Sequence, residues 1–245
     1  MTGIFSYIHS AVFWFLAFFY SIIIGAVSYV AALFAKNERE KNIIYQKGAR
    51  LWGSLLVDAA GLKVGVSGLE NIPADTAVIF TPNHQSYLDI FILLKILPHP
   101  FRFVIMRKLF KVPVIGYHIK QAGFISLDRK DRKRSIRTIH QVIELLKNNE
   151  SFVIFPEGKL TLDGTIGEFG RGASIIIQRS QTPVVPILID GTFAALPKST
   201  WILKPGKVTV KIGRPVHFKE YHDDVSKSKS MELGNELREI VASLC

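Results

Sequence analysis

The chain of 245 residues is long enough to bury one substantial core without dividing into two domains. It is 48% hydrophobic with a net charge of +11, which implies an anionic partner such as nucleic acid, a membrane surface or a phosphorylated substrate. The sequence has no zinc-ligand cluster and no RNA-binding signature, so nucleic acid ranks last, and the single cysteine, Cys245, excludes an internal disulfide bond and a cysteine metal site.

The N-terminal segment is unusually apolar. Residues 1–35 contain no Lys, Arg, Asp or Glu, and residues 11–35 exceed the roughly 20 residues that one helix needs to cross a bilayer. Aromatic side chains crowd the first half of this stretch, and because Trp and Tyr favour the headgroup boundary, a shallow or re-entrant hairpin is an alternative. Basic residues follow directly, from Lys36 to Arg50, which predicts that the rest of the chain lies on the cytoplasmic side.

Two other interpretations of this segment are weaker. A cleaved signal peptide would begin with basic residues and have a shorter apolar stretch. A buried core helix would be apolar along one stripe, whereas this segment reads as apolar all round. We therefore expect residues 1–36 to anchor the protein to a membrane and residues 37–245 to form one domain.

The remaining residues alternate between helical and strand patterns. In chain order they predict a helix over 37–62, strands at 64–66 and 77–81, a helix over 90–97, strands at 103–106 and 123–127, a helix over 135–147, a strand at 151–155, a helix over 173–179, strands at 184–189 and 208–212, and a helix over 231–244. This alternation is typical of a single α/β domain with a mostly parallel sheet flanked by helices. Ligands in such folds gather at the carboxyl ends of strands, where 82–89 and 156–159 are the most polar segments here.

A histidine and an aspartate follow the strand expected at 77–81. His84 and Asp89 would point about 140° apart on one regular helix, so they can meet only if His84 precedes the helix and Asp89 lies in its first turn. The carboxylate would then hold one ring nitrogen and leave the other free to accept a proton. Ser86 and Asp89 also match a helix capping box, which by itself would account for Asp89.

Three further blocks accompany this pair. They are Gly123-Phe124-Ile125-Ser126-Leu127-Asp128-Arg129, then Phe155-Pro156-Glu157-Gly158, and then Val185-Pro186. Proline inside an apolar strand removes a hydrogen-bond donor, so an edge strand or a bulge is expected at Pro186. With Asn83-His84-x4-Asp89, these blocks resemble in order and spacing the glycerolipid acyltransferase family typified by 1-acylglycerol-3-phosphate acyltransferases.

The resemblance spans residues 77–186 and, more loosely, extends to 215. The chain departs from the family pattern after Gly158, where Lys159 and Leu160 replace a small hydroxyl residue and an arginine. Arg107 stands where relatives commonly have a lysine, and the stretch 169–173, which contains Arg171, resembles a family stretch that normally carries basic residues before its glycine.

The resemblance implies a reaction and a set of roles. His84, oriented by Asp89, would be the general base that deprotonates the sn-2 hydroxyl of lysophosphatidate, and the oxygen would attack an acyl-CoA or acyl-carrier-protein thioester to give phosphatidate. Residues expected to bind the acceptor are Arg129 for the phosphate, Glu157, Gly158 and, as weaker candidates, Lys159 and Arg171. No metal and no bound cofactor are expected.

The same sequence also fits three alternatives. The acceptor could be another lysolipid or glycerol 3-phosphate. A hydrolase would use the same base to activate water. A lipid-binding scaffold would not need His84 or Asp89 for any reaction. The basic run 129–134 is either a solvated surface or a contact with anionic headgroups.

Overall fold

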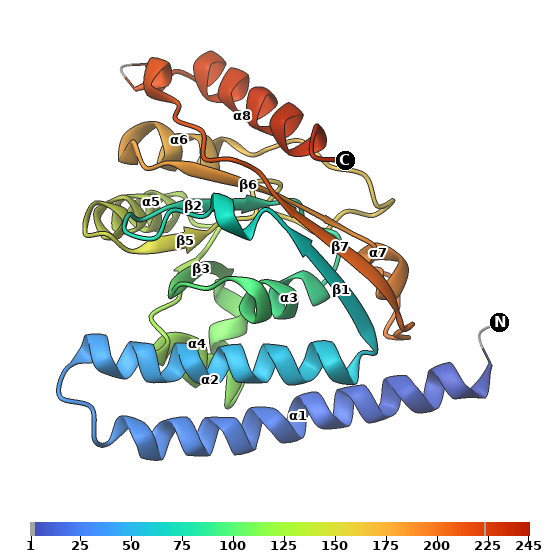
Figure 1. Ribbon diagram of the computed structural model, residues 1–245. Coiled ribbons are helices and arrows are strands. Elements are labelled where there is room, and N and C mark those ends of the chain that lie inside the picture. Colours follow the sequence, from blue (N-terminus) through green and yellow to red (C-terminus); the bar gives the residue numbers. More distant parts are fainter. Residues whose placement is uncertain (1–2, 223) are drawn as a thin grey trace.

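The computed structural model describes residues 3–222 and 224–245. It begins with two antiparallel helices, α1 (Ile4–Ala32) and α2 (Glu38–Ala59), which lie side by side along the lower side of the molecule (Figure 1). Asn37 caps α2 by accepting a hydrogen bond from the backbone N–H of Glu40. The boundary expected at 36/37 falls in the turn between these two helices.

The α1 helix is not apolar on every side, which corrects the sequence-based expectation. Its buried residues are small or aromatic and lie on one stripe: Ser10, Phe13, Ser21, Gly25 and Ser28. Gly25 leaves room for the His118 ring, and Gly48 of α2 leaves room for the Ser28 hydroxyl. Large apolar side chains on the other sides of α1 are exposed. The helix is therefore long and apolar enough to cross a membrane, yet it packs lengthwise on α2.

Seven strands form one sheet in the order β1-β7-β6-β2-β5-β3-β4. Their bounds are β1 (Leu62–Ser67), β2 (Ile79–Pro82), β3 (Phe101–Met106), β4 (Ile125–Leu127), β5 (Ser151–Val153), β6 (Val184–Asp190) and β7 (Gly206–Ile212). All neighbours are parallel except β6 and β7, which are antiparallel. The mostly parallel α/β fold expected from the sequence is thus confirmed.

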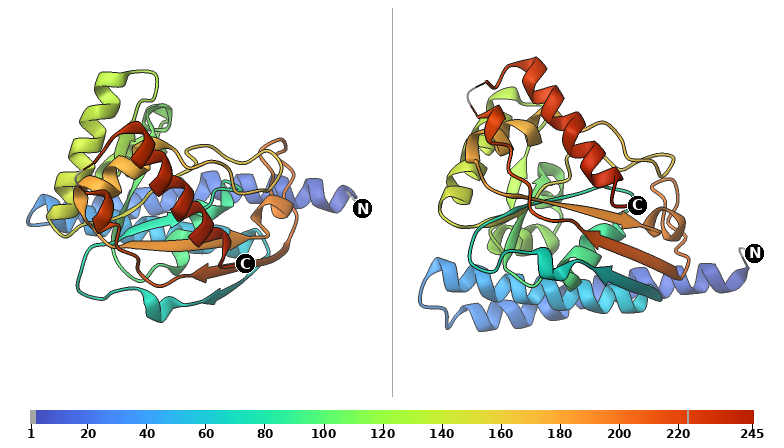
Figure 2. Two further views of the ribbon diagram at one scale, coloured as in Figure 1. Left: turned by 90° about the horizontal axis from the view of Figure 1, so that it is seen from above. Right: turned by 45° about the horizontal axis from the view of Figure 1, so that its top comes forward.

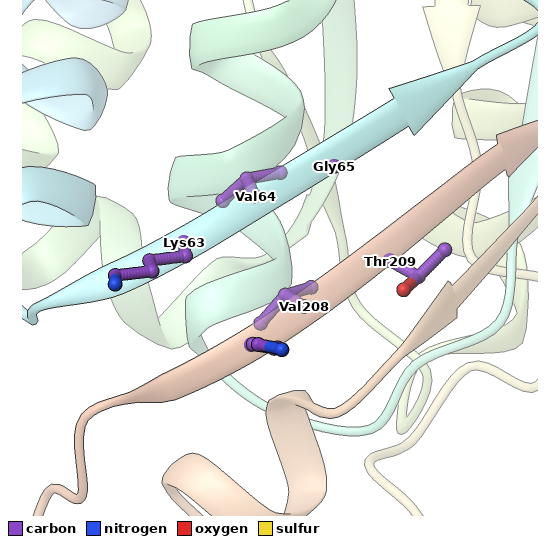
Figure 3. Close-up of a pocket in the computed structure, with 6 residues that line it drawn as sticks. Lys63, Val64, Gly65, Val208 and Thr209 are labelled. Carbon is purple, nitrogen blue, oxygen red and sulfur yellow. The ribbon is translucent and has the colours of Figure 1, made fainter.

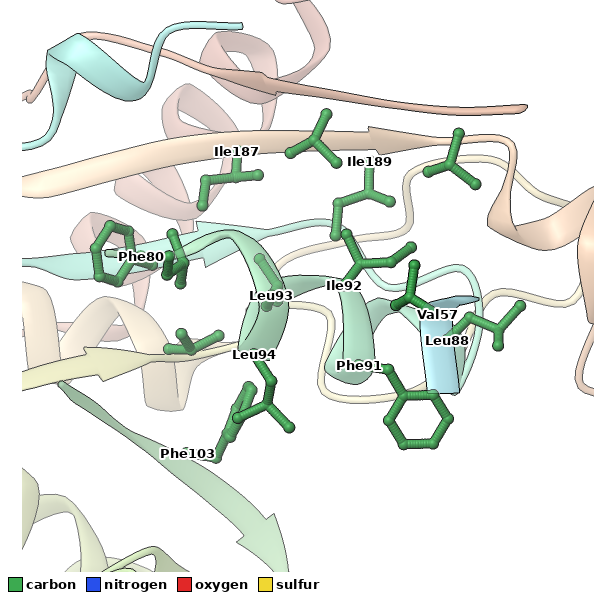
Figure 4. Packing of buried hydrophobic residues seen from close by; sticks show 14 of the residues in the cluster. Val57, Phe80, Leu88, Phe91, Ile92, Leu93, Leu94, Phe103, Ile187 and Ile189 are labelled. Carbon is green, nitrogen blue, oxygen red and sulfur yellow. The ribbon is translucent and has the colours of Figure 1, made fainter. Parts of the chain in front are cut away.

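Helices cover both faces of the sheet (Figures 1 and 2). On one face α3 (Leu88–Ile96) packs against α2 and the strands, with α4 (Ile115–Gln121) nearby; on the other lie α5 (Arg132–Lys147), α6 (Arg171–Ser180) and α8 (Lys227–Ala242). Successive β2 side chains alternate between the two cores. Phe80 joins the α2–α3 side, as Figure 4 shows, and Ile79 joins the α5–α6–α8 side.

Pro186 lies in a central strand, so the expected edge position is wrong. The bulge alternative fits the pairing: Val184 pairs with Val216 and Ile187 with Ile212, so two residues of β6 oppose three residues of the neighbouring segment. Gly213 donates its backbone N–H to the Pro186 carbonyl within this bulge.

The sequence pattern gave no element over 107–121, where the structure has a 3₁₀ helix, η2 (Arg107–Lys111), and α4. Both are too short to display a helical period, and Pro113 separates them. The expected strands at 123–127 and 151–155 are shorter than predicted, because their outer residues belong to the turn after α4 and to the loop after β5. A four-residue helix, α7 (Thr192–Ala195), also went unpredicted.

Candidate active site

The carboxyl ends of β2, β4, β5 and β6 point to one edge of the sheet because these strands are linked by parallel pairings. The segments that follow them carry His84, Arg129, Glu157 and Thr192, respectively; the first three lie in loops and Thr192 begins α7. The two polar segments singled out in the sequence, 82–89 and 156–159, therefore lie at the same edge, as expected for an α/β ligand site.

His84 and Asp89 meet as the sequence spacing predicts. His84 precedes α3 and Asp89 lies in its first turn, with His84 Nδ1 and Asp89 Oδ2 2.9 Å apart. The His84 side chain is 13% exposed and that of Asp89 is fully buried. With Nδ1–H donating to the carboxylate, the Nε2 atom is left without a hydrogen-bond partner among the residues described.

Asp89 also organises the loop that carries His84. Its Oδ2 accepts the backbone N–H groups of Gln85 (2.7 Å) and Ser86 (2.9 Å), while Oδ1 accepts the Thr192 hydroxyl at 2.6 Å. The bond to Ser86 N–H is one half of a capping box, while the Ser86 hydroxyl accepts the Leu88 N–H of the first turn at 3.2 Å and donates to the Leu196 carbonyl. Asp89 thus both caps the helix and orients the histidine.

Glu157 holds the His84 backbone in place. Its Oε1 accepts the His84 N–H at 2.9 Å and its Oε2 accepts the Gly167 N–H at 3.1 Å, so both oxygens have backbone partners. Burial raises the pKa of Glu157 above its ordinary value, and the two backbone hydrogen bonds partly oppose that rise. The carboxylate therefore connects the loop after β2 to the loop after β5.

The His84 ring stacks on Phe155, with ring centroids 3.8 Å apart and planes inclined by 22°. Asn83 secures the other side of the loop, because its side chain exchanges two hydrogen bonds with the backbone of Ile189 on β6, at 2.9 and 2.7 Å. The imidazole is thus fixed by an aromatic face, a carboxylate and a locked backbone.

Arg129 lies over Gly158. Gly158 has a positive φ of 67°, and a Cβ at this position would collide with the Arg129 guanidinium. Partial burial lowers the pKa of Arg129 from its ordinary value, and the guanidinium stays charged at neutral pH. Within the described chain it makes no hydrogen bond or ion pair. The neighbouring Asp128 instead pairs with Arg107 and Arg134.

The two weaker anion-binding candidates lie differently. Lys159 is exposed directly after Gly158. Arg171 begins α6 and donates to the Val225 carbonyl near the start of α8, at 3.2 Å. The structure thus brings His84, Asp89, Glu157, Arg129 and Gly158 together and commits Arg171 to a contact with another segment.

Sequence reasoning missed Thr192, Gly167 and the stacking role of Phe155. Phe155 is adjacent to the recognised Pro156-Glu157-Gly158 block, which is a usable signal, whereas Thr192 and Gly167 contribute through contacts that no local pattern encodes.

A hollow of about 320 Å³ lies elsewhere, on the outer strands (Figure 3). It is lined by β1 and β7 alone, and β7 is separated from β2 by β6, so the hollow is not part of this site. Across residues 3–222 and 224–245, no group of three or more His, Cys, Asp or Glu side chains is placed to hold a metal ion.

Comparison with known proteins gives consistent matches. A family model described as acyltransferase matches residues 63–190. The chloroplastic 1-acyl-sn-glycerol-3-phosphate acyltransferase LPAT1 of Arabidopsis thaliana is 36% identical over 79% of this chain and 52% of its own length. The 1-acyl-sn-glycerol-3-phosphate acyltransferase of Pseudomonas aeruginosa is 32% identical over 79% of this chain and 74% of its own length.

The crystal structure of the 1-acyl-sn-glycerophosphate acyltransferase PlsC from Thermotoga maritima superimposes with a TM-score of 0.83 at 28% identity, covering 100% of this chain and 98% of that one. The chain spans about half the length of the plant and algal relatives, at 46–52% of their residues.

Proposed function

This chain belongs to the acyltransferase family, and on that premise we propose that it transfers a fatty acyl group from a thioester to the sn-2 hydroxyl of 1-acylglycerol 3-phosphate, giving phosphatidate. The observation that carries the proposal is the His84–Asp89 pair: a base with one ring nitrogen held by a buried carboxylate and the other without a partner. Such a pair suits proton removal from a hydroxyl.

His84 Nε2 takes the proton from the acceptor hydroxyl as the oxygen attacks the thioester carbonyl carbon. Asp89 stabilises the imidazolium that forms. The carbon–sulfur bond then breaks, and the thiolate leaves with the proton that His84 returns. Because a free thiol has a pKa of about 8.5, this leaving group needs little help at neutral pH.

The acyl group passes directly to the acceptor. The hydroxyl nearest in sequence, Ser86, is fully buried and donates to the Leu196 carbonyl at 2.7 Å, so it is not available to His84 as a nucleophile. With no serine or cysteine paired to the base in the described chain, an acyl-enzyme intermediate lacks a nucleophile.

Arg129 binds the acceptor phosphate. Its guanidinium is free of acidic partners within the described chain, and a planar guanidinium matches phosphate geometry through paired N–H donors. Gly158 contributes by leaving the space that the guanidinium occupies, and exposed Lys159 adds a second positive charge. Glu157 acts mainly through the His84 backbone, and Arg171 contributes least because it is engaged with Val225.

The α1 helix holds the enzyme at a membrane surface. It spans about 43 Å at 1.5 Å per residue and packs along α2, which itself packs on α3. Because crossing the bilayer would carry this packed body into the hydrocarbon, α1 lies in the plane of one leaflet with its exposed apolar side chains in the lipid. Basic residues after the helix, such as Lys36 and Arg39, favour the anionic cytoplasmic leaflet.

Radiolabelled acyl-CoA and acyl-carrier-protein thioester, each with and without lysophosphatidate, test the reaction in detergent. Phosphatidate that requires lysophosphatidate and disappears in His84→Ala supports the proposal and identifies the donor. Free fatty acid released without acceptor would instead indicate a hydrolase. Product formed only from glycerol 3-phosphate or another lysolipid would reassign the acceptor, and no turnover with membrane binding intact would indicate a scaffold.

A further inference from the structure

The two carboxylate oxygens of Asp89 differ in their hydrogen bonds: Oδ2 has three donors, whereas Oδ1 has one. Oδ2 accepts three N–H donors, from His84 Nδ1 and from the backbones of Gln85 and Ser86. Oδ1 accepts only the Thr192 hydroxyl among the described residues, at 2.6 Å. Because Asp89 is fully buried, no solvent can replace that donor, and a buried carboxylate oxygen without a donor is costly.

The Thr192 hydroxyl has little alternative to this bond. Thr192 is also fully buried, and the other acceptor within reach is Gln85 Oε1 at 3.4 Å, compared with 2.6 Å for Asp89 Oδ1. A hydroxyl donates one hydrogen, and the shorter bond to a charged acceptor is the stronger one. Its proton therefore points at Asp89.

The backbone presents Thr192 to Asp89 in a fixed position. Gly191, at the end of β6, has a φ of 97°, and a Cβ there would collide with the Lys207 carbonyl. Three residues before Thr192, Ile189 exchanges both backbone hydrogen bonds with the Asn83 side chain, which directly precedes His84. Thr192 and the catalytic loop are thus locked to each other through β6.

We infer that Thr192 is a positioning residue of the acyl-transfer reaction: it fixes the rotation of the Asp89 carboxylate, which in turn fixes the His84 ring. This inference rests on the proposed function of the His84–Asp89 pair. Without the bond to Oδ1, the two backbone N–H groups still hold Oδ2, but the carboxylate can tilt about its χ2 angle. The imidazole bonded to Oδ2 then tilts away from the orientation that aims Nε2 at the acceptor hydroxyl. Thr192 touches neither substrate, so its loss slows the chemical step and leaves binding unchanged.

Thr192→Val removes the hydroxyl and keeps the shape, while Thr192→Ser keeps the hydroxyl and removes the methyl group. We expect Thr192→Val to lower kcat about 10- to 100-fold, with the KM values for lysophosphatidate and thioester within about twofold of wild type. Thr192→Ser should stay within about threefold of wild type. Thr209→Val, the same change at an exposed position on β7, serves as a control with no expected effect.

A second comparison separates orientation of the charge from a general structural role. In an Asp89→Ala background, where no side chain remains for Thr192 to orient, Thr192→Val should cost less than about threefold in kcat. Histidine ¹⁵N spectra, with His84 identified by its loss in His84→Gln, should report one ring tautomer in wild type and a mixture in Thr192→Val. If Thr192→Val does not fold, Thr192→Ala carries the same measurements.

Equal kcat in wild type and Thr192→Val would overturn the inference, as would a loss that Thr192→Ser does not rescue or that persists in full beside Asp89→Ala. A raised KM with unchanged kcat would also overturn it. These results require that wild type makes phosphatidate in the same assay. Absence of wild-type turnover would instead count against the proposed function.

Discussion

Replacing Asp89 by asparagine removes a charge while the hydrogen-bond geometry can be kept. The backbone N–H groups of Gln85 and Ser86 are fixed donors to Oδ2, so the amide must place its carbonyl oxygen there. That oxygen still accepts from His84 Nδ1, and the ring keeps its tautomer. The amide NH₂ then faces Thr192, whose hydroxyl can accept from it and donate to Gln85 Oε1, 3.4 Å away.

The expected loss of rate follows from electrostatics alone. Two unit charges about 4 Å apart interact by about 4 kcal/mol at an effective dielectric constant of about 20. This attraction between Asp89 and the His84 imidazolium is absent in Asp89→Asn, and at 1.36 kcal/mol per factor of ten it corresponds to about a 10³-fold lower kcat. Weaker hydrogen bonds to a neutral acceptor should cost about 1–2 kcal/mol of stability, a shift of a few degrees in Tm.

Initial rates of phosphatidate formation in detergent and thermal unfolding followed by tryptophan fluorescence measure the two effects. Asp58→Asn is a matched control, because Asp58 is 64% exposed and pairs with Lys95 on the surface, where an ion pair contributes about 1 kcal/mol or less. A kcat for Asp89→Asn within tenfold of wild type would refute the electrostatic role. An unfolded variant would refute the hydrogen-bond reasoning.

Three further outcomes are expected. Arg129→Ala should raise the KM for lysophosphatidate about 10- to 100-fold in steady-state assays, because it removes a charged hydrogen-bond donor to phosphate. Arg137→Ala, at an exposed position of α5, should leave the KM unchanged. Gly158→Ala should raise the same KM with kcat near wild type, since the new Cβ displaces the guanidinium; an unaltered KM would mean that Arg129 has room to move. Because burial raises the pKa of Glu157, its ionisation costs the folded state more than the unfolded one, whose pKa is about 4.5. As pH rises from 4 to 7, wild type should lose unfolding free energy relative to Glu157→Gln in urea titrations, and a constant difference would contradict this.

The sequence by itself determined the features that depend on near neighbours in the chain. His84 and Asp89 are five positions apart, and the only geometry that lets them meet, a loop histidine with a first-turn aspartate, follows from the helical period. The alternation of strands and helices determined the parallel sheet in the same way, and the parallel sheet implied that His84, Arg129 and Glu157 share one edge.

Tertiary structure alone decided the features that depend on which distant segments meet. The bond between Asp89 and Thr192 joins residues 103 apart, and the Glu157 carboxylate joins two backbone N–H groups from separate loops. Pro186 is accommodated in a central strand by the bulge in the neighbouring segment. The α1 helix buries only one stripe of residues, because Gly25 packs against His118 and Ser28 packs against Gly48 of α2. Local patterns report burial and period, whereas the identity of a hydrogen-bond partner is set by how strands and loops pack in three dimensions.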